Sequence, residues 1–161
     1  MKTTMKLGGA VAAAALAIGL GAGGVLAQAQ DKAAVIKDRQ DTMKSMGQAL
    51  GGVKAFTEDK ADLKQAQDSA DRLVQIIKTI GTKFQPGTSM ADAPNVSWAK
   101  PELWTDKAKF DDALKNATAE VEKLDAAVKT GDKGKITAQF ADTGKNGCGG
   151  CHTPFRQAKP S

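Results

Sequence analysis

The sequence predicts an all-α protein, an antiparallel four-helix bundle with one long crossover loop. Apolar residues recur every three or four positions in four segments after residue 30, as they do on the buried face of a helix. The alternation of apolar and polar residues that is typical of strands is absent from these segments. Short connections containing glycine separate the first segment from the second and the third from the fourth, which favours antiparallel neighbours.

The first two helices are expected on either side of a pair of glycines. The first is expected over residues 31–50, and Gly51 and Gly52 are predicted to end it. The second is expected between Thr57, as its N-cap, and Ile80. Their apolar faces consist of Val35, Ile36, Met43, Met46, Leu50 and Val53 in the first segment and of Leu63, Ala66, Ala70, Leu73, Val74, Ile77 and Ile80 in the second.

The last two helices are predicted from cap signals. Thr105 with Asp106 opens the third helix, and Gly131 stops it. Asp132 or Lys133 opens the fourth, which carries the C-terminal motif described below. Residues 82–104 form the crossover loop, because the prolines at positions 86, 94 and 101 forbid a regular helix there. The tryptophans at positions 98 and 104 are expected to cover the core rather than bind a ligand.

The motif Cys148-Gly149-Gly150-Cys151-His152 contains every cysteine and the only histidine of the chain. Residues three and four apart share one face of a helix, so two thiols can reach the vinyl groups of one porphyrin while the imidazole binds its iron. A disulfide over this spacing would be strained, a redox dithiol belongs to a βαβ unit, and structural zinc takes four ligands. The motif therefore predicts one covalent haem c, containing Fe, near the C-terminal helix.

The N-terminus has the pattern of a bacterial export signal. Lys2 and Lys6 precede the uncharged run 7–26, and Ala27-Gln28-Ala29 fits the A-x-A cleavage rule. We therefore expect a cleaved signal peptide over 1–29 and one mature domain over 30–161. The alternative is a membrane anchor, since the run approaches spanning length. A periplasmic location agrees with haem attachment, because bacteria attach c-type haem outside the cytoplasm.

The mature chain carries mixed charge. Removal of the signal leaves 132 residues with 21 basic and 18 acidic side chains, interspersed along the sequence. This pattern is typical of a solvated surface and not of a nucleic-acid-binding protein. Arg39 is the exception, because it lies between Ile36 and Met43 on an otherwise apolar helix face. Either a haem propionate pairs with it, or its head extends into water at the end of the bundle.

Four segments together resemble the cytochrome c′ family and its low-spin relatives, whose haem motif lies near the C-terminus. They are Arg39-Gln40-x-x-Met43, Phe84-Gln85-Pro86-Gly87-Thr88, Pro101-Glu102-Leu103-Trp104 and the stretch from Cys148 to Arg156. The resemblance covers the mature chain in order. It departs from the family at about Gly81, where an aromatic residue is usual.

The resemblance implies a role for each motif residue. Cys148 and Cys151 form the thioethers, and His152 is the proximal iron ligand, with Arg156 beside it. Arg39 and Gln40 approach the haem propionates. Met43 falls at the distal position, where the family has either an apolar residue over a five-coordinate iron or a coordinating methionine; we expect the five-coordinate form.

Four functions compete for this sequence. A five-coordinate haem protein would transfer electrons and bind NO or CO, whereas a six-coordinate carrier would use Met43 as a ligand. A peroxidase would need a distal acid–base residue, and no second histidine exists, so we expect no enzyme activity. A haem-free helical interaction protein would require the motif to be accidental. The expected partners are redox proteins and small gases, with no nucleic acid, no membrane after signal cleavage, and a possible homodimer.

Overall fold

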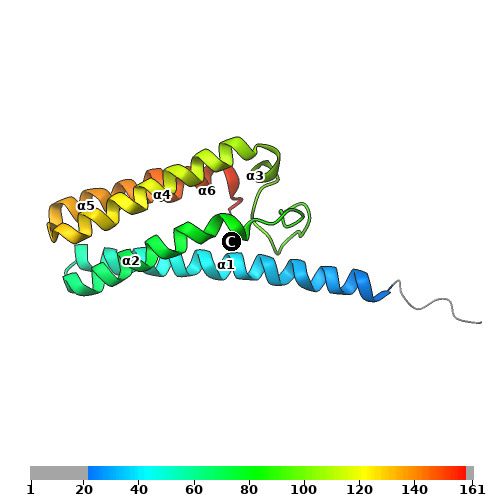
Figure 1. The fold of residues 1–161 in the computed structure, drawn as a ribbon, viewed down its shortest axis with the longest axis horizontal. Helices are drawn as coiled ribbons and strands as arrows, with labels where there is room; N and C mark the ends of the chain where they lie inside the picture. The colour runs from blue at the N-terminus through cyan, green and yellow to red at the C-terminus, as the bar shows by residue number, and fades with distance from the viewer. Residues whose placement is uncertain (1–21, 159–161) are drawn as a thin grey trace, which may run out of the picture.

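The computed structural model describes residues 22–158 and forms the predicted four-helix bundle (Figure 1). Most of the predicted signal segment, residues 1–21, lies outside the described residues. The helices, in chain order, are α1 (Ala22–Thr57), α2 (Leu63–Ile80), α3 (Glu102–Thr105), α4 (Lys107–Thr130), α5 (Lys133–Asp142) and α6 (Gly149–Phe155), with a 3₁₀ turn over Gly81–Lys83 and a π-helical turn over Thr143–Cys148. The turn Thr143–Cys148 joins α5 and α6 into the fourth long helix of the bundle.

The caps explain where three of the helices begin. Asp62 opens α2 with a reciprocal capping box, in which its carboxylate accepts from the Gln65 backbone N–H at 2.8 Å and the Gln65 side chain accepts from the Asp62 N–H at 3.0 Å. Asp106 and Asp132 cap α4 and α5 in the simpler way. Gly131 ends α4 with a φ of 71°, a conformation that suits glycine. The predicted starts and stop of the last two helices are confirmed.

The predicted boundary between the first two helices is wrong. Helix α1 continues through Gly51 and Gly52 to Thr57, and Thr57 is not the cap of α2. Each glycine in a helix interior costs about 1 kcal/mol, but the continued helix buries Val53 completely. At Gly52 the absence of a side chain also allows α1 to approach α2, because a Cβ there would lie 2.1 Å from Ser69 Oγ.

The helices pack in two layers around one main core. Figure 1 shows α1 and α2 side by side below α4, α5 and α6. The main core joins both layers and includes Val53, Leu73, Leu124, Val128 and Ile136. A second cluster of Leu103, Phe110 and Phe155 lies at the end where the crossover loop passes from α2 to α4.

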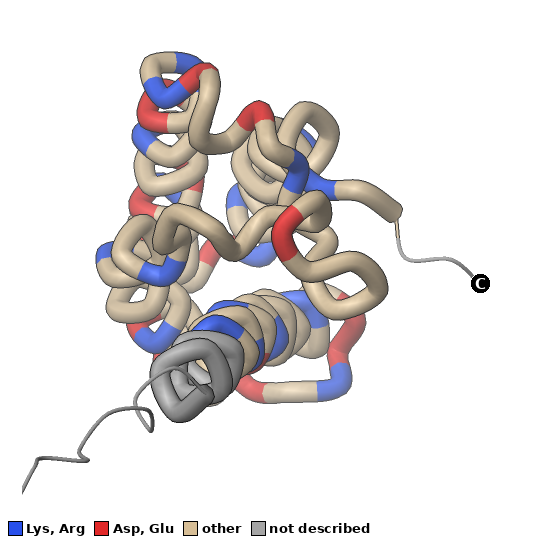
Figure 2. The backbone as a smooth tube through the Cα atoms, turned by 90° about the vertical axis from the view of Figure 1, so that its right-hand side faces the viewer, with Lys and Arg blue, Asp and Glu red and all other residues tan. Residues whose placement is uncertain are grey.

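The crossover loop is irregular between Phe84 and Pro101, as the prolines predict. Trp104 lies at its end, where the indole N–H donates to the Phe84 carbonyl oxygen at 3.2 Å. Figure 2 shows basic and acidic residues interspersed along the tube, in agreement with the sequence pattern. No helix within residues 22–158 combines the length and the apolarity needed to cross a bilayer.

Candidate cofactor site

The π-helical turn Thr143–Cys148 leads directly into the motif. Thr143 is fully buried, and its hydroxyl donates to the Glu120 carbonyl oxygen on α4 at 3.0 Å. Gly147 lies so close to α4 that a Cβ on it would be 3.2 Å from the Glu120 Cβ. This turn was not predicted from the sequence, although glycines at positions 144 and 147 were its visible signal. Such turns are frequent at functional sites, and this one sets which face the motif presents.

The motif borders a cavity between the two layers of the bundle. The cavity has an outer lobe of about 440 Å³ and an adjoining inner lobe of about 240 Å³. Cys151, His152 and Met43 line both lobes, and Cys148 lines the inner one. The structure thus brings both predicted attachment residues and both predicted axial residues to one cavity.

The two lobes differ in charge. The inner lobe is lined by apolar side chains from three helices, among them Leu50, Leu73, Ile77, Ile80 and Val121. The outer lobe carries three cationic side chains, Arg39, Lys44 and Arg156. No carboxylate lines either lobe among the described residues. A ligand that fills the cavity should therefore be apolar at its inner end and anionic at its outer end.

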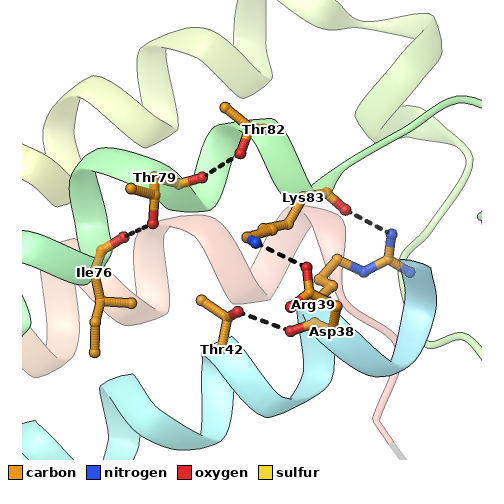
Figure 3. Close-up of polar contacts among 7 residues, drawn as sticks. All are labelled: Asp38, Arg39, Thr42, Ile76, Thr79, Thr82 and Lys83. Carbon is orange, nitrogen blue, oxygen red and sulfur yellow. Dashed lines mark hydrogen bonds and ion pairs between the residues drawn. The ribbon is translucent and has the colours of Figure 1, made fainter. Parts of the chain in front are cut away.

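Arg39 is buried, with only 4% of its surface exposed. Its Nη1 donates to Thr88 Oγ1 at 2.8 Å, and its Nη2 donates to the Thr88 carbonyl oxygen at 2.9 Å and to Ser97 Oγ at 3.0 Å. Figure 3 shows the longer contact, 3.5 Å, to the Lys83 carbonyl oxygen. All these acceptors are neutral, so the buried charge has no carboxylate partner among the described residues, and burial lowers the pKa of Arg39. The contact to a propionate stays a prediction.

Burial also affects the protonation of the motif. It raises the pKa of the Cys148 thiol and raises the pKa of Cys151 to about 11, to which the nearby Cys148 also contributes. Burial, together with the positive charge of Arg156, lowers the pKa of His152. A neutral imidazole keeps a free lone pair, which is the form that binds a metal.

The other predicted residues lie around the outer lobe. Gln40 lines it and donates from Nε2 to the Val96 carbonyl oxygen at 2.7 Å. Arg156 is exposed at its mouth. Two further residues of α1 line the lobe and were not predicted from the sequence: Lys44, one turn after Gln40, and Gly47, one turn after Met43. Their helical spacing from Gln40 and Met43 was the available signal.

Aromatic side chains form one wall of the cavity. Phe84 and Phe110 both line it and meet edge to face, with ring centroids 5.0 Å apart. Trp98 also lines the outer lobe. From the sequence, this tryptophan was expected to cover the core and not to line a ligand site. At Gly81, the position without the usual aromatic, Leu114 takes the space, because a Cβ on Gly81 would lie 2.9 Å from its Cδ2.

A haem c fits these residues. It has an apolar vinyl edge and an anionic propionate edge, which match the inner and outer lobes. Cys148 and Cys151 both line the apolar inner lobe. The buried guanidinium of Arg39 has no carboxylate partner among the described residues. The outer lobe, at about 440 Å³, falls within the range of about 300–1,000 Å³ that is usual for ligand pockets.

Comparison with known proteins points the same way. The sequence profile of the family described as Cytochrome C′ matches residues 34–156. The cytochrome c′ of Rubrivivax gelatinosus is 36% identical over 132 residues, covering 81% of this chain and 99% of the relative. Its crystal structure superposes with a TM-score of 0.67 and covers 76% of this chain and 94% of that one.

Two solved structures of cytochrome c′ variants from Alcaligenes xylosoxidans contain bound gases. A ferrous variant with NO is 28% identical, has a TM-score of 0.68, and covers 78% of this chain and 94% of that one. A variant with carbon monoxide is also 28% identical, has a TM-score of 0.67, and covers 77% of this chain and 94% of that one.

Proposed function

Because the chain belongs to the cytochrome c′ family and, like it, carries covalent haem c, we propose that it is a periplasmic protein that transfers electrons and binds small gases such as NO and CO. The observation that carries the proposal is the cavity that joins Cys151 and His152 to Met43. When bound, the haem would supply a redox-active iron that can bind a diatomic ligand. The bound NO and CO of the Alcaligenes proteins support the gas ligands.

The residues that would hold the cofactor lie at the end of the π-helical turn and in α6. Cys148 and Cys151 would form the two thioethers, and the His152 imidazole, whose pKa is lowered by burial, would be the proximal ligand. Arg156, which also lines the outer lobe, lies near enough to His152 for its positive charge to lower the pKa of the imidazole. Arg39 and Lys44 supply positive charge at the outer lobe, where the propionates would be bound, and Gln40 lines the same lobe.

Helix α1 supplies the distal wall. Met43 would cover the distal side without binding the iron firmly, and Gly47, one turn further on, adds no side chain to this wall. An apolar wall of this kind admits small neutral gases and disfavours anions. The alternative is a six-coordinate electron carrier in which the Met43 sulfur is the sixth ligand.

The proposed role is not enzymatic. Peroxidase chemistry needs an acid–base group on the distal side. None of the described α1 side chains that line the cavity is a carboxylic acid or an imidazole. These side chains are Arg39, Gln40, Met43, Lys44, Met46 and Leu50.

The test is haem attachment in protein isolated from the periplasm. Acid–acetone extraction should leave the haem on a chain that begins at Gln30, as read by mass spectrometry. The double variant Cys148→Ser/Cys151→Ser should release its haem into the solvent, whereas Thr137→Val, a change on the exposed face of α5, should not. Haem lost from the unaltered protein, or a retained residue 1–29 segment, would contradict the proposal.

A further inference from the structure

Residues 83–100, which we name the strap, join the two sides of the cavity. Helix α1 lies on one side with Met43, and α6 lies on the other with His152. Helix α1 packs mainly on α2, whereas α6 packs mainly on α4 and the π-helical turn. The two sides therefore have little direct contact, and the strap is bonded to both.

Arg39 makes most of the hydrogen bonds between α1 and the strap. It reaches Thr88 with two hydrogen bonds and Ser97 with a third, and these two strap residues are nine positions apart. Two contacts flank it: Gln40 donates to the Val96 carbonyl oxygen at 2.7 Å, and Figure 3 shows the Lys83 ammonium donating to Asp38 at 2.8 Å.

The C-terminal end of the strap is bonded to the segment that follows His152. The backbone N–H of Lys100 donates to the Phe155 carbonyl oxygen at 2.9 Å. The backbone N–H of Gln157 donates to the Trp98 carbonyl oxygen at 2.8 Å. These bonds begin only three residues after His152, so the strap is attached to the C-terminal end of the helix that carries it.

Hydrogen bonds within the strap join its first half, around Thr88, to its second half, around Ser97. Ser97 Oγ donates to the Thr88 carbonyl oxygen at 2.8 Å, and the Met90 N–H donates to the Ala99 carbonyl oxygen at 2.7 Å. Thr88 is 2% exposed and Ser97 is fully buried. Hydrogen bonds from a buried cation are strong, and a buried partner left without one is costly, so this cluster has one favoured arrangement.

We propose that Arg39 is a positioning residue that fixes the strap through Thr88 and Ser97 and thereby sets the spacing between Met43 and His152. This rests on the proposed function, because that spacing matters only with a haem between the two side chains. This role is separate from a direct contact with a propionate. Three guanidinium N–H groups donate to Thr88 and Ser97, and a longer contact reaches the Lys83 carbonyl oxygen, so Arg39 would act on the haem by setting the width of the cavity.

The test alters the strap without altering the cavity. Thr88 and Ser97 do not line either lobe. In holoprotein, Ser97→Ala and Thr88→Val should accelerate amide hydrogen exchange at Lys100 and Gln157 by about tenfold, because local opening becomes easier. They should also change the rate of CO dissociation from the reduced protein. Thr137→Val, which removes a hydroxyl bonded within α5, is the matched control and should change neither.

Variants of Arg39 separate the two ways in which it can act. Arg39→Lys keeps the charge but loses the bonding pattern, so it should behave like Ser97→Ala. If Ser97→Ala and Thr88→Val match the unaltered protein in exchange and CO kinetics while Arg39→Met does not, Arg39 acts directly on the haem and the proposal is wrong. If the unaltered protein carried no covalent haem, the proposed function would be wrong. Amide exchange at Lys100 and Gln157 would in that case still measure how Thr88, Ser97 and Arg39 hold the strap.

Discussion

Gly52 and Ser69 bring α1 and α2 closer together than any side chain at position 52 would allow. A Cβ on Gly52 would lie 2.1 Å from Ser69 Oγ and 2.8 Å from Ser69 Cβ. The second distance matters more, because Cβ is fixed to the α2 backbone and cannot rotate away. The glycine that was expected to end the first helix instead permits two helices to touch.

The first prediction compares two adjacent glycines. Gly52→Ala should destabilise the protein by about 1–3 kcal/mol, because overpacking outweighs the gain in helix propensity. Gly51→Ala should stabilise it by about 0.5–1 kcal/mol, since a Cβ there meets nothing within 4 Å. Urea unfolding of both variants measures the difference. The penalty of Gly52→Ala should be smaller when it is measured against Ser69→Gly than against the unaltered protein, and an equal penalty in the two backgrounds would place the strain elsewhere.

The second prediction concerns the distal side chain. Met43→Leu should leave the resting optical spectrum nearly unchanged and should alter the rates of gas binding, because an apolar group of similar volume replaces one that does not bind the iron. Spectra of the oxidised and reduced protein are the measurement. Conversion from low spin to high spin, with loss of the sulfur-to-iron charge-transfer band, would establish Met43 as the sixth ligand and the six-coordinate alternative.

The third prediction uses the space beside Met43. Gly47 lines both lobes, so a side chain added there would narrow the cavity next to Met43. Gly47→Leu should fold normally and slow CO association by roughly tenfold, which corresponds to about 1.4 kcal/mol in the barrier. Gly51→Leu is the control, because it adds the same side chain one turn further along α1 and outside the cavity lining. Equal rates in the two variants would remove Gly47 from the gas path.

The fourth prediction is the homodimer. The resemblance suggests pairing through the first two helices, and within the described residues Val96 is the only large apolar side chain that is exposed, at 49%. Any dimer should therefore be weak and sensitive to concentration. Analytical ultracentrifugation across micromolar concentrations should show the mass rising from monomer to dimer. A monomer mass throughout would reject the pairing.

The class of fold and the chemistry of the motif follow from local signals in the amino-acid sequence. Helical periodicity, the caps Asp106 and Asp132 and the stop at Gly131 each depend on residues within one helical turn. The spacing of Cys148, Cys151 and His152 is local in the same way. It therefore predicts a covalent haem without any knowledge of how the helices pack.

Three other features depend on contacts between distant parts of the chain. Helix α1 passes through Gly51 and Gly52 because Val53 is buried against residues far away in sequence. The π-helical turn that ends at Cys148 depends on close packing against α4, which the glycines at positions 144 and 147 permit but do not specify. Arg39 meets Thr88 and Ser97 across 49 and 58 positions, so its partners follow from where the strap lies. Local propensities depend on a few neighbouring residues. The burial of a side chain and the hydrogen-bond partners of a buried charge depend instead on residues that are distant in sequence and become neighbours only in the folded chain.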